Sequence, residues 1–155
     1  MKNVFWAKLL AKVFLLLKGI YEHQTIGARA ILIDGDKILL VRQSLVRGWQ
    51  FPGGGVDVGE SFAKTAKRET FEETGYQIRG EMQLHGVFHN IEATNRDHLA
   101  FYISYDFERL NEFKKSKEIV EIKWFLIDEL PDDLAQGAKN RVAEIFENKP
   151  ISDKW

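Results

Sequence analysis

The 155-residue sequence contains no cysteine, which excludes disulfides, zinc–thiolate sites and thiol nucleophiles. It has no excess of charge either, because 22 lysines and arginines and 23 aspartates and glutamates leave a net charge of −1. A nucleic-acid partner is therefore not expected. We see no internal repeat, low-complexity tract or interdomain linker. The length predicts one compact domain, and the lack of cysteine fits a reducing, cytoplasmic location.

A long hydrophobic run is also missing, although residues 1–22 come nearest to one. Lys8, Lys12 and Lys18 interrupt this segment before it reaches the ~20 apolar residues that span a bilayer, and no small-residue cleavage site follows it. Its apolar residues fall on one helical face and its lysines on the other. The pattern predicts an amphipathic helix that packs on its own domain or on a second subunit as a homodimer, with a membrane-surface helix as the alternative.

The sequence does contain a series of strand patterns. Residues 26–33 and 37–42 are aliphatic runs joined by Asp34-Gly35-Asp36, which predicts an antiparallel hairpin. Further strands are expected over residues 49–51, 82–89, 98–107 and 119–126, and the three glycines of residues 53–55 are expected to form a loop. Helices are expected between Ser61 and Gly75 and over residues 133–147. This mixture indicates an α/β or α+β layered domain.

The helix between Ser61 and Gly75 has a charge arrangement that local preferences disfavour. Glu72 and Glu73 follow Glu69 by three and four residues, so the carboxylates share one face, and each like-charge pair at these spacings costs ~0.2–0.5 kcal/mol. A divalent cation would neutralise them, because Mg²⁺ prefers oxygen ligands and leaves coordination positions for phosphates. The alternative is a solvated acidic helix end.

The segment of residues 54–76 resembles the Nudix box, GX5EX7REUXEEXGU, in which U is an aliphatic residue. Thr70 and Tyr76 depart from the two U positions, which affects packing and not metal binding. The box covers 23 of the 155 residues, and the strand hairpin before it is also similar to that family. All seven fixed letters stand at their spacing: Gly54, Glu60, Arg68, Glu69, Glu72, Glu73 and Gly75.

The resemblance implies a MutT-like hydrolase of pyrophosphate bonds that depends on Mg²⁺, with Mn²⁺ as a substitute. It implies that Glu69 and Glu73 bind the cation with help from Glu72 and from the carbonyl of Gly54, and that Arg68 orients these carboxylates. The implied fold is a Nudix-like α/β/α sandwich with a mixed central sheet over residues 23–149, followed by a tail of residues 150–155.

The general base varies in this family between a box glutamate and a carboxylate from a later loop. Here the candidates are Glu72 and Glu118, with Glu121 as the fallback. Glu118 could serve as the base or as an extra metal ligand, and the alternative is an exposed glutamate among lysines. Arg29 and Arg42 lie inside apolar strands and are candidate substrate ligands, since a guanidinium can bind phosphate with two hydrogen bonds. The alternative is that both reach the rim of the sheet.

The implied substrate is a nucleoside diphosphate linked to another moiety, with ADP-ribose-like compounds first and nucleoside triphosphates, oxidised ones included, second. A non-catalytic nucleotide-binding domain on the same fold is a further hypothesis, which the presence of all four box glutamates disfavours. His85, His89 and His98 are expected to be hydrogen-bonded strand residues, because the sequence lacks zinc-site spacing.

Overall fold

The computed structural model describes residues 12–13, 25–91 and 96–155. The helix expected over residues 1–22 lies outside these ranges except for Lys12 and Val13, which are helical and exposed. In the part that is described, no helix is long and apolar enough to cross a membrane. The strands are β1 (Thr25–Asp34), β2 (Lys37–Gln43), β3 (Trp49–Gln50), β4 (Gly53–Gly55), β5 (Tyr76–Ile78), β6 (Gln83–His89), β7 (Asp97–Ser104), β8 (Phe107–Arg109) and β9 (Ile119–Leu126), and the helices are α2 (Phe62–Thr74), the 3₁₀ turn η1 (Ile127–Glu129) and α3 (Gln136–Phe146).

The strands β1 and β2 form the predicted hairpin, but they pair only next to the turn, through Ile33–Ile38 and Asp34–Lys37. Farther along, β1 pairs in parallel with β7 and antiparallel with β4, whereas β2 pairs antiparallel with β3 and β9. The main sheet, with the order β3-β2-β1-β7-β6, is therefore mixed. It is also split between β1 and β2, and Phe51 and Pro52 cross this split from β3 to β4.

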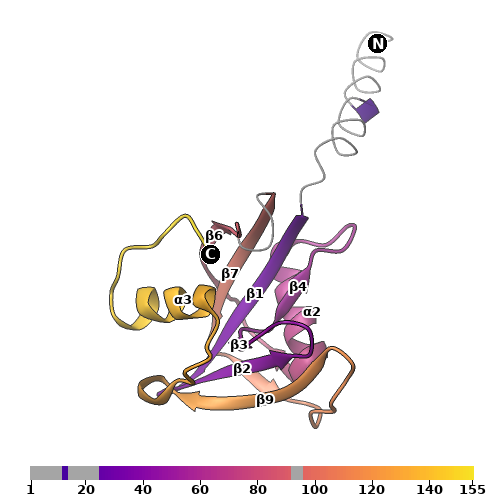
Figure 1. Ribbon diagram of the computed structural model, residues 1–155. Coiled ribbons are helices and arrows are strands. Elements are labelled where there is room, and N and C mark those ends of the chain that lie inside the picture. Colours follow the sequence, from indigo (N-terminus) through magenta and orange to yellow (C-terminus); the bar gives the residue numbers. More distant parts are fainter. Residues whose placement is uncertain (1–11, 14–24, 92–95) are drawn as a thin grey trace.

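The two faces of the sheet carry separate buried cores. An aromatic and aliphatic core, which includes Phe51 and Phe101, lies under α3, and a core of smaller residues, which includes Ala28 and Ala30 of β1 and Ala66 of α2, lies under α2. Figure 1 shows the two helices on opposite sides of the strands. The predicted layered fold with a mixed sheet is confirmed. Because the residues between α2 and β1 are small, the helix can approach the sheet closely.

The glycine segment is a strand and not the loop that the sequence predicted. Gly53, Gly54 and Gly55 pair with Arg29, Ala28 and Gly27 of β1. The pairing depends on small residues on both strands, since a Cβ at Gly27 would lie 3.1 Å from the carbonyl oxygen of Gly54. Because glycine has a low intrinsic preference for strands, β4 forms only through its pairing with β1.

Two other boundaries differ from the prediction. The helix α3 begins at Gln136 and not at residue 133, because Trp49 N donates to Asp133 O (3.1 Å) and Ala135 N donates to Trp49 O (2.9 Å). The strand β7 ends at Ser104, and Phe107 instead begins β8, which pairs with β5 in a separate two-stranded ribbon. The sequence patterns predicted neither strand of this ribbon.

Residues 150–155, expected as a tail, lie along the edge strand β6. His89 N donates to Asp153 O (2.8 Å), and Trp155 N donates to His89 O (3.0 Å). The Trp155 ring packs edge-on against Phe88 and Phe101 of the core under α3. Both terminal nitrogens of the buried Arg141 donate to Lys154 O at 3.2 Å. The segment therefore completes one face of the domain.

Candidate active site

The helix α2 has the ends that the sequence predicted. Ser61 Oγ accepts from Lys64 N (3.2 Å) at the start, and at the end Gly75 is left-handed, with φ 79°, and donates to Phe71 O (2.9 Å). These caps satisfy backbone groups that the helix leaves unpaired. They fix the rotation of the helix, so that its last two turns present their carboxylates to the split in the sheet.

Glu73 lies in that split and is almost fully buried, with 8% of its surface exposed. Its Oε2 accepts from Gly53 N of β4 (2.9 Å), and its Oε1 accepts from the Gln43 amide of β2 (3.4 Å). Burial raises the pKa of Glu73 to about 7, although both hydrogen bonds and the charge of Arg29 act in the opposite direction. The carboxylate of Glu73 thus links β2 to β4, the strand that pairs with β1, across the split in the sheet.

Glu69 lies one turn earlier, with its carboxylate against β4. A Cβ at Gly54 would be 2.6 Å from Glu69 Cδ, so only glycine leaves room for this approach. Burial raises the pKa of Glu69, and the negative charges of Glu72 and Glu118 act in the same direction, whereas Arg68 opposes them. The carboxylate of Glu69 is therefore held in surroundings that disfavour its negative charge, as at sites that bind a cation.

Arg68 connects the carboxylate that precedes the helix with those on it. Its Nε and Nη2 donate to the carboxylate of Glu60 at 3.0–3.2 Å, and its Nη1 donates to Glu69 (2.7 Å) and Glu72 (3.2 Å). The hydrogen bonds from Arg68 hold the pKa of Glu60 down to about 2, and the same bonds raise the pKa of Arg68. Because the guanidinium is planar and forked, it fixes the directions of all three acids.

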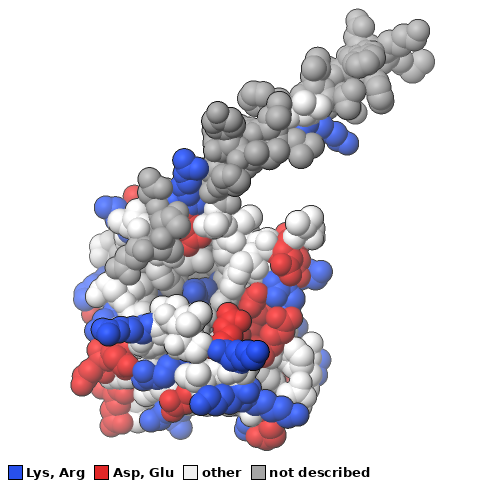
Figure 2. Space-filling model, turned by 45° about the vertical axis from the view of Figure 1, so that its right-hand side comes forward, with Lys and Arg blue, Asp and Glu red and all other residues white. Residues whose placement is uncertain are grey.

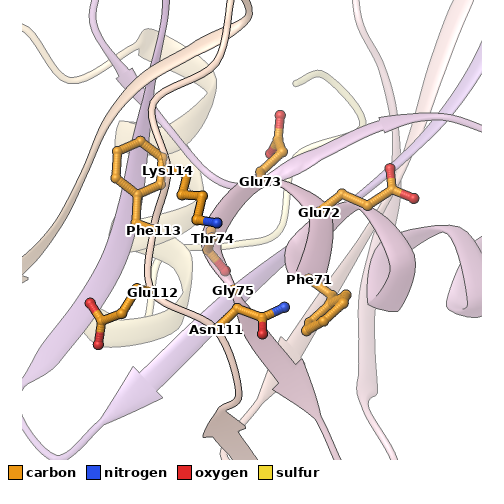
Figure 3. Close-up of a pocket in the computed structure, with 9 residues that line it drawn as sticks. All are labelled: Phe71, Glu72, Glu73, Thr74, Gly75, Asn111, Glu112, Phe113 and Lys114. Carbon is orange, nitrogen blue, oxygen red and sulfur yellow. The ribbon is translucent and has the colours of Figure 1, made fainter.

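The three helix carboxylates do not converge on one point. Glu72 is 56% exposed, and Figure 3 shows its carboxylate and that of Glu73 pointing in different directions beside a cavity of about 520 Å³. Within residues 25–91 and 96–155, no three acidic, histidine or cysteine side chains are arranged to hold a metal ion. The donors still suit a hard cation, because they are oxygens and Glu69 lies in space that a side chain at Gly54 would fill.

The candidate bases lie in different surroundings. Glu118 is exposed just before β9, and its charge contributes to the raised pKa of Glu69. Glu121 lies within β9 opposite Arg42, with 3.9 Å between its Oε2 and Arg42 Nε. The charge of Glu118 therefore acts on Glu69, whereas Glu121 faces Arg42.

The two strand arginines also differ from each other. Arg29 Nη1 donates to Phe51 O (2.6 Å), and burial lowers the pKa of Arg29 while the nearby Glu73 opposes this shift. Its Nε is buried and has no hydrogen-bond partner among the described residues. Arg42 lies over the Trp49 ring, 4.7 Å from its centroid, and pairs with Asp133 (2.9 Å). Arg42 lines a cavity of about 680 Å³.

Sequence reasoning missed Gln43, which lies at the end of β2 beside this cavity and binds Glu73. A polar residue directly after Arg42 in an apolar strand is the one signal that could have indicated it. His85 and His89 lie on β6, and His98 lies on β7. His85 Nε2 lies 2.8 Å from Glu144 Oε2, and His89 stacks on His98 at 5.0 Å. Figure 2 shows basic and acidic side chains interspersed on the visible face, in agreement with the net charge of −1.

The family model described as NUDIX domain matches residues 23–145. A Bacillus subtilis protein provisionally named as an 8-oxo-dGTP diphosphatase is 40% identical over 78 residues, which are 50% of this chain and 52% of that protein. The chain spans about half the length, or less, of the first curated relatives that it matches.

Solved structures agree on the fold. A MutT NUDIX hydrolase from Burkholderia pseudomallei superimposes with a TM-score of 0.71 over 79% of this chain and 98% of that one, at 24% identity, which supports the fold alone. An ADP-ribose pyrophosphatase from Streptococcus suis is 26% identical, with a TM-score of 0.62 over 84% of this chain and 95% of that one. Since the family model covers most of the chain and the box residues line the split in the sheet, the protein belongs to the NUDIX hydrolase family and has a MutT-like NUDIX domain.

Proposed function

We propose that this protein hydrolyses a phosphoric anhydride bond in a nucleoside diphosphate linked to another moiety, with ADP-ribose-like compounds as the first candidates. One observation carries the proposal: burial raises the pKa of both Glu69 and Glu73, which are nevertheless held beside β4 by Gly53 and Gly54. Two carboxylates kept in a place that disfavours their charge support a role in binding a cation together with phosphate.

The residues that would hold Mg²⁺, or Mn²⁺ in its place, are Glu69, Glu73 and the carbonyl of Gly54, with Glu72 as a further ligand. When bound, such a cation would neutralise phosphate charge, lower the pKa of a bound water and stabilise the leaving oxygen. The chain itself supplies the positioning, because Arg68 Nη1 donates hydrogen bonds to the carboxylates of Glu69 and Glu72.

The proton of the attacking water needs an acceptor close to these carboxylates. Glu118 is our first candidate, because its charge is felt at Glu69, and Glu72 is the second. Arg42 lines the cavity of about 680 Å³ that also contains Gln43, and Gln43 binds Glu73. This cavity is in the size range of ligand pockets, and we assign the nucleoside and its phosphates to it.

Arg29 lies deeper than Arg42. Its hydrogen bond to Phe51 O and its proximity to Glu73 support a role as a fixed positive charge behind the carboxylates. Direct contact with a phosphate would require the guanidinium to leave Phe51. We therefore assign phosphate binding first to Arg42 and only second to Arg29.

Nucleoside triphosphates are a second candidate substrate class. The Bacillus subtilis relative, which carries the name of an 8-oxo-dGTP diphosphatase, favours this class, and oxidised nucleotides belong in the test for that reason. A nucleotide-binding domain without activity is a third candidate. The retention of Glu60, Glu69, Glu72 and Glu73, together with the pairing of Arg68 to three of them, argues against it.

The test is a panel of nucleoside diphosphate sugars, dinucleotides and nucleoside triphosphates, incubated with Mg²⁺ and assayed with and without an added phosphatase to identify the products. The wild type should hydrolyse at least one class. Glu73→Gln should be inactive, since it keeps the size of the side chain and removes its charge. The matched control is Glu81→Gln, because Glu81 is an exposed glutamate outside α2.

The outcomes separate the candidates. Loss of turnover in Glu73→Gln with full activity in Glu81→Gln supports the proposal. A folded wild-type protein that binds nucleotides and hydrolyses none of them favours the non-catalytic domain. Equal activity in Glu73→Gln and wild type would show that the helix carboxylates are not part of the active site.

A further inference from the structure

Two histidines face each other on neighbouring strands near the edge of the sheet. His89 of β6 is in register with His98 of β7, and the centroids of their rings are 5.0 Å apart, with an angle of 12° between the planes. The two residues are nine positions apart in the sequence, which is unlike the local ligand spacing of zinc sites. Only the pairing of the two strands brings the rings together.

The backbone bonds of His89 explain why the rings lie so close. Its N–H donates to Asp153 O (2.8 Å), and its carbonyl accepts from Trp155 N (3.0 Å), so both groups point away from β7. His89 and His98 therefore form a pair without mutual backbone hydrogen bonds. In such pairs the opposed Cα atoms are only ~4.5 Å apart and the side chains come closest to each other.

The strands that carry the two rings are fixed on both sides. On one side β1 pairs with β7, and on the other side residues 153–155 bond to β6; Figure 1 shows β6 and β7 next to each other at this end of the sheet. The carboxylate of Asp97 accepts from Thr25 Oγ1 (2.7 Å) and from Asn90 Nδ2 (2.8 Å), which joins the first residue of β1 and the residue after β6 to β7. A ligand between the rings would therefore have to order only two side chains.

The two rings offer nitrogen atoms, which are ligands for Zn²⁺, Ni²⁺ and Cu²⁺, whereas Mg²⁺ prefers oxygen. Two metal–nitrogen bonds of ~2.0–2.1 Å require nitrogens about 3 Å apart. Rotation about the Cβ–Cγ bonds, which are broad torsions in histidine, can bring the ring edges to this separation without a change in the backbone. Both side chains are half-buried, so an ion can reach them and water can fill its other coordination positions. Lys154 lies opposite His89 but is exposed, and its long side chain can keep the ammonium in water.

His85 lies on the same strand and has different surroundings. Its Nε2 lies 2.8 Å from Glu144 Oε2 of α3, and its side chain is only 8% exposed. His98 faces the other side of the sheet, because it pairs with Ile26, which shares its face of β1 with Ala28 of the core under α2. The sheet therefore separates the histidine pair from His85.

We propose that His89 and His98 form a binding site for a transition-metal dication, with Zn²⁺ as the first candidate. The site is separate from the carboxylates of α2, because β1 lies between β7, which carries His98, and β4, which carries Gly54. A bound ion would join β6 to β7 at the point where residues 153–155 attach. The site does not depend on the proposed hydrolysis.

The test is a calorimetric titration of the full-length protein with Zn²⁺ in a large excess of Mg²⁺, which occupies oxygen sites. The wild type should bind one Zn²⁺ per chain. His89→Gln and His98→Gln should each raise Kd more than about tenfold, because the loss of even an outer-shell partner of a metal ligand costs about 10- to 100-fold. The matched control is His85→Gln, a histidine of the same strand on the other face, which should stay within about twofold of wild type.

Two further measurements report on the ligands and on the fold. The electron paramagnetic resonance spectrum of Cu²⁺ bound to the wild type should show coupling to two imidazole nitrogens, and each single variant should show at most one. At a free Zn²⁺ concentration of ~100 Kd, the melting temperature of the wild type should rise by about 5–10 °C, and that of His89→Gln or His98→Gln by less than about 2 °C.

The lack of saturable Zn²⁺ binding in the presence of Mg²⁺ overturns the proposal. Binding that His89→Gln and His98→Gln retain, or that His85→Gln weakens equally, also overturns it. Glu73→Gln distinguishes the two sites, since an unchanged Zn²⁺ affinity supports a separate site and a loss of binding assigns the ion to the carboxylates of α2. The nucleotide panel measures the proposed hydrolysis separately, so the failure of one proposal is distinguishable from the failure of the other.

Discussion

Replacing Gly54 by alanine tests whether Glu69 has to lie against β4. The new Cβ would be 2.6 Å from Glu69 Cδ and 2.7 Å from each carboxylate oxygen, whereas ordinary contacts begin at 3.4 Å. The carboxylate must therefore move by about 0.8 Å to restore an ordinary contact. Gly54 is not among the residues with positive φ, so alanine is compatible with the backbone and the disturbance acts on the side chain of Glu69.

A displacement of this size should be visible mainly in the rate. A misplacement of ~1 Å in an active site can lower the rate about 10²-fold, which corresponds to about 2.7 kcal/mol of transition-state stabilisation. We expect kcat/KM of Gly54→Ala to fall about 100-fold, while the free energy of unfolding changes by less than about 1 kcal/mol. Initial rates on the best substrate of the panel and urea unfolding measure the two effects.

Gly55→Ala is the matched control, because it makes the same chemical change one residue later and its Cβ would have nothing within 4 Å. It should keep kcat/KM within about twofold of wild type. The reasoning is refuted if Gly54→Ala is as active as wild type, or if Gly55→Ala loses as much activity as Gly54→Ala.

Three further changes test the ion pairs and the packing. The folded pKa of Glu60 is about 2, below the ordinary 4.5, so its charge stabilises the fold fully above pH 4.5 and loses this effect as the pH falls toward 2. The melting-temperature difference between wild type and Glu60→Gln should shrink over that window; a difference independent of pH would contradict this. Glu144→Gln removes the counter-charge of the buried Arg141 and should cost about 3 kcal/mol in urea unfolding, and an unchanged midpoint would disprove it. Trp155→Ala should cost about 2 kcal/mol with kcat/KM close to wild type, and a stable but inactive variant would show that this segment serves the active site.

Local signals in the sequence were sufficient to predict the helix that carries the carboxylates. Ser61 and Gly75 are capping residues, and a cap acts on the backbone groups of its own helix, so both predicted ends are confirmed. The turn at Asp34-Gly35-Asp36 is equally local, and the hairpin was predicted correctly. The helical repeat alone also predicted that Glu69 and Glu73 share one face of α2, and both carboxylates lie beside β4; their role as cation ligands stays a prediction.

The errors concern features that depend on partners distant in the sequence. Residues Gly53–Gly55 have no intrinsic preference for a strand. They form one because they pair with Gly27 and its neighbours on β1. The start of α3 was placed too early, because residues 133–135 bond to Trp49, about 85 residues before them. The contact between Gln43 and Glu73 joins residues 30 positions apart. No window of neighbouring residues contains such information.

The separation of β1 from β2 also determines where this domain can accept insertions during evolution. Residues 44–48 join β2 to β3 and contribute Ser44, Val46, Arg47 and Gly48 to the cavity of about 680 Å³ beside Arg42, so a longer or shorter loop there would alter which molecules fit and leave the pairing of β4 with β1 unchanged. One extra residue between Phe51 and Gly54 would instead shift β4 along β1 and turn each of its residues to the opposite side. Gly53 N would then move away from Glu73, and the space that the missing side chain of Gly54 leaves free would no longer face Glu69. A change in the length of the loop before Trp49 is thus compatible with the chemistry, whereas a change in length between Phe51 and Gly54 is not.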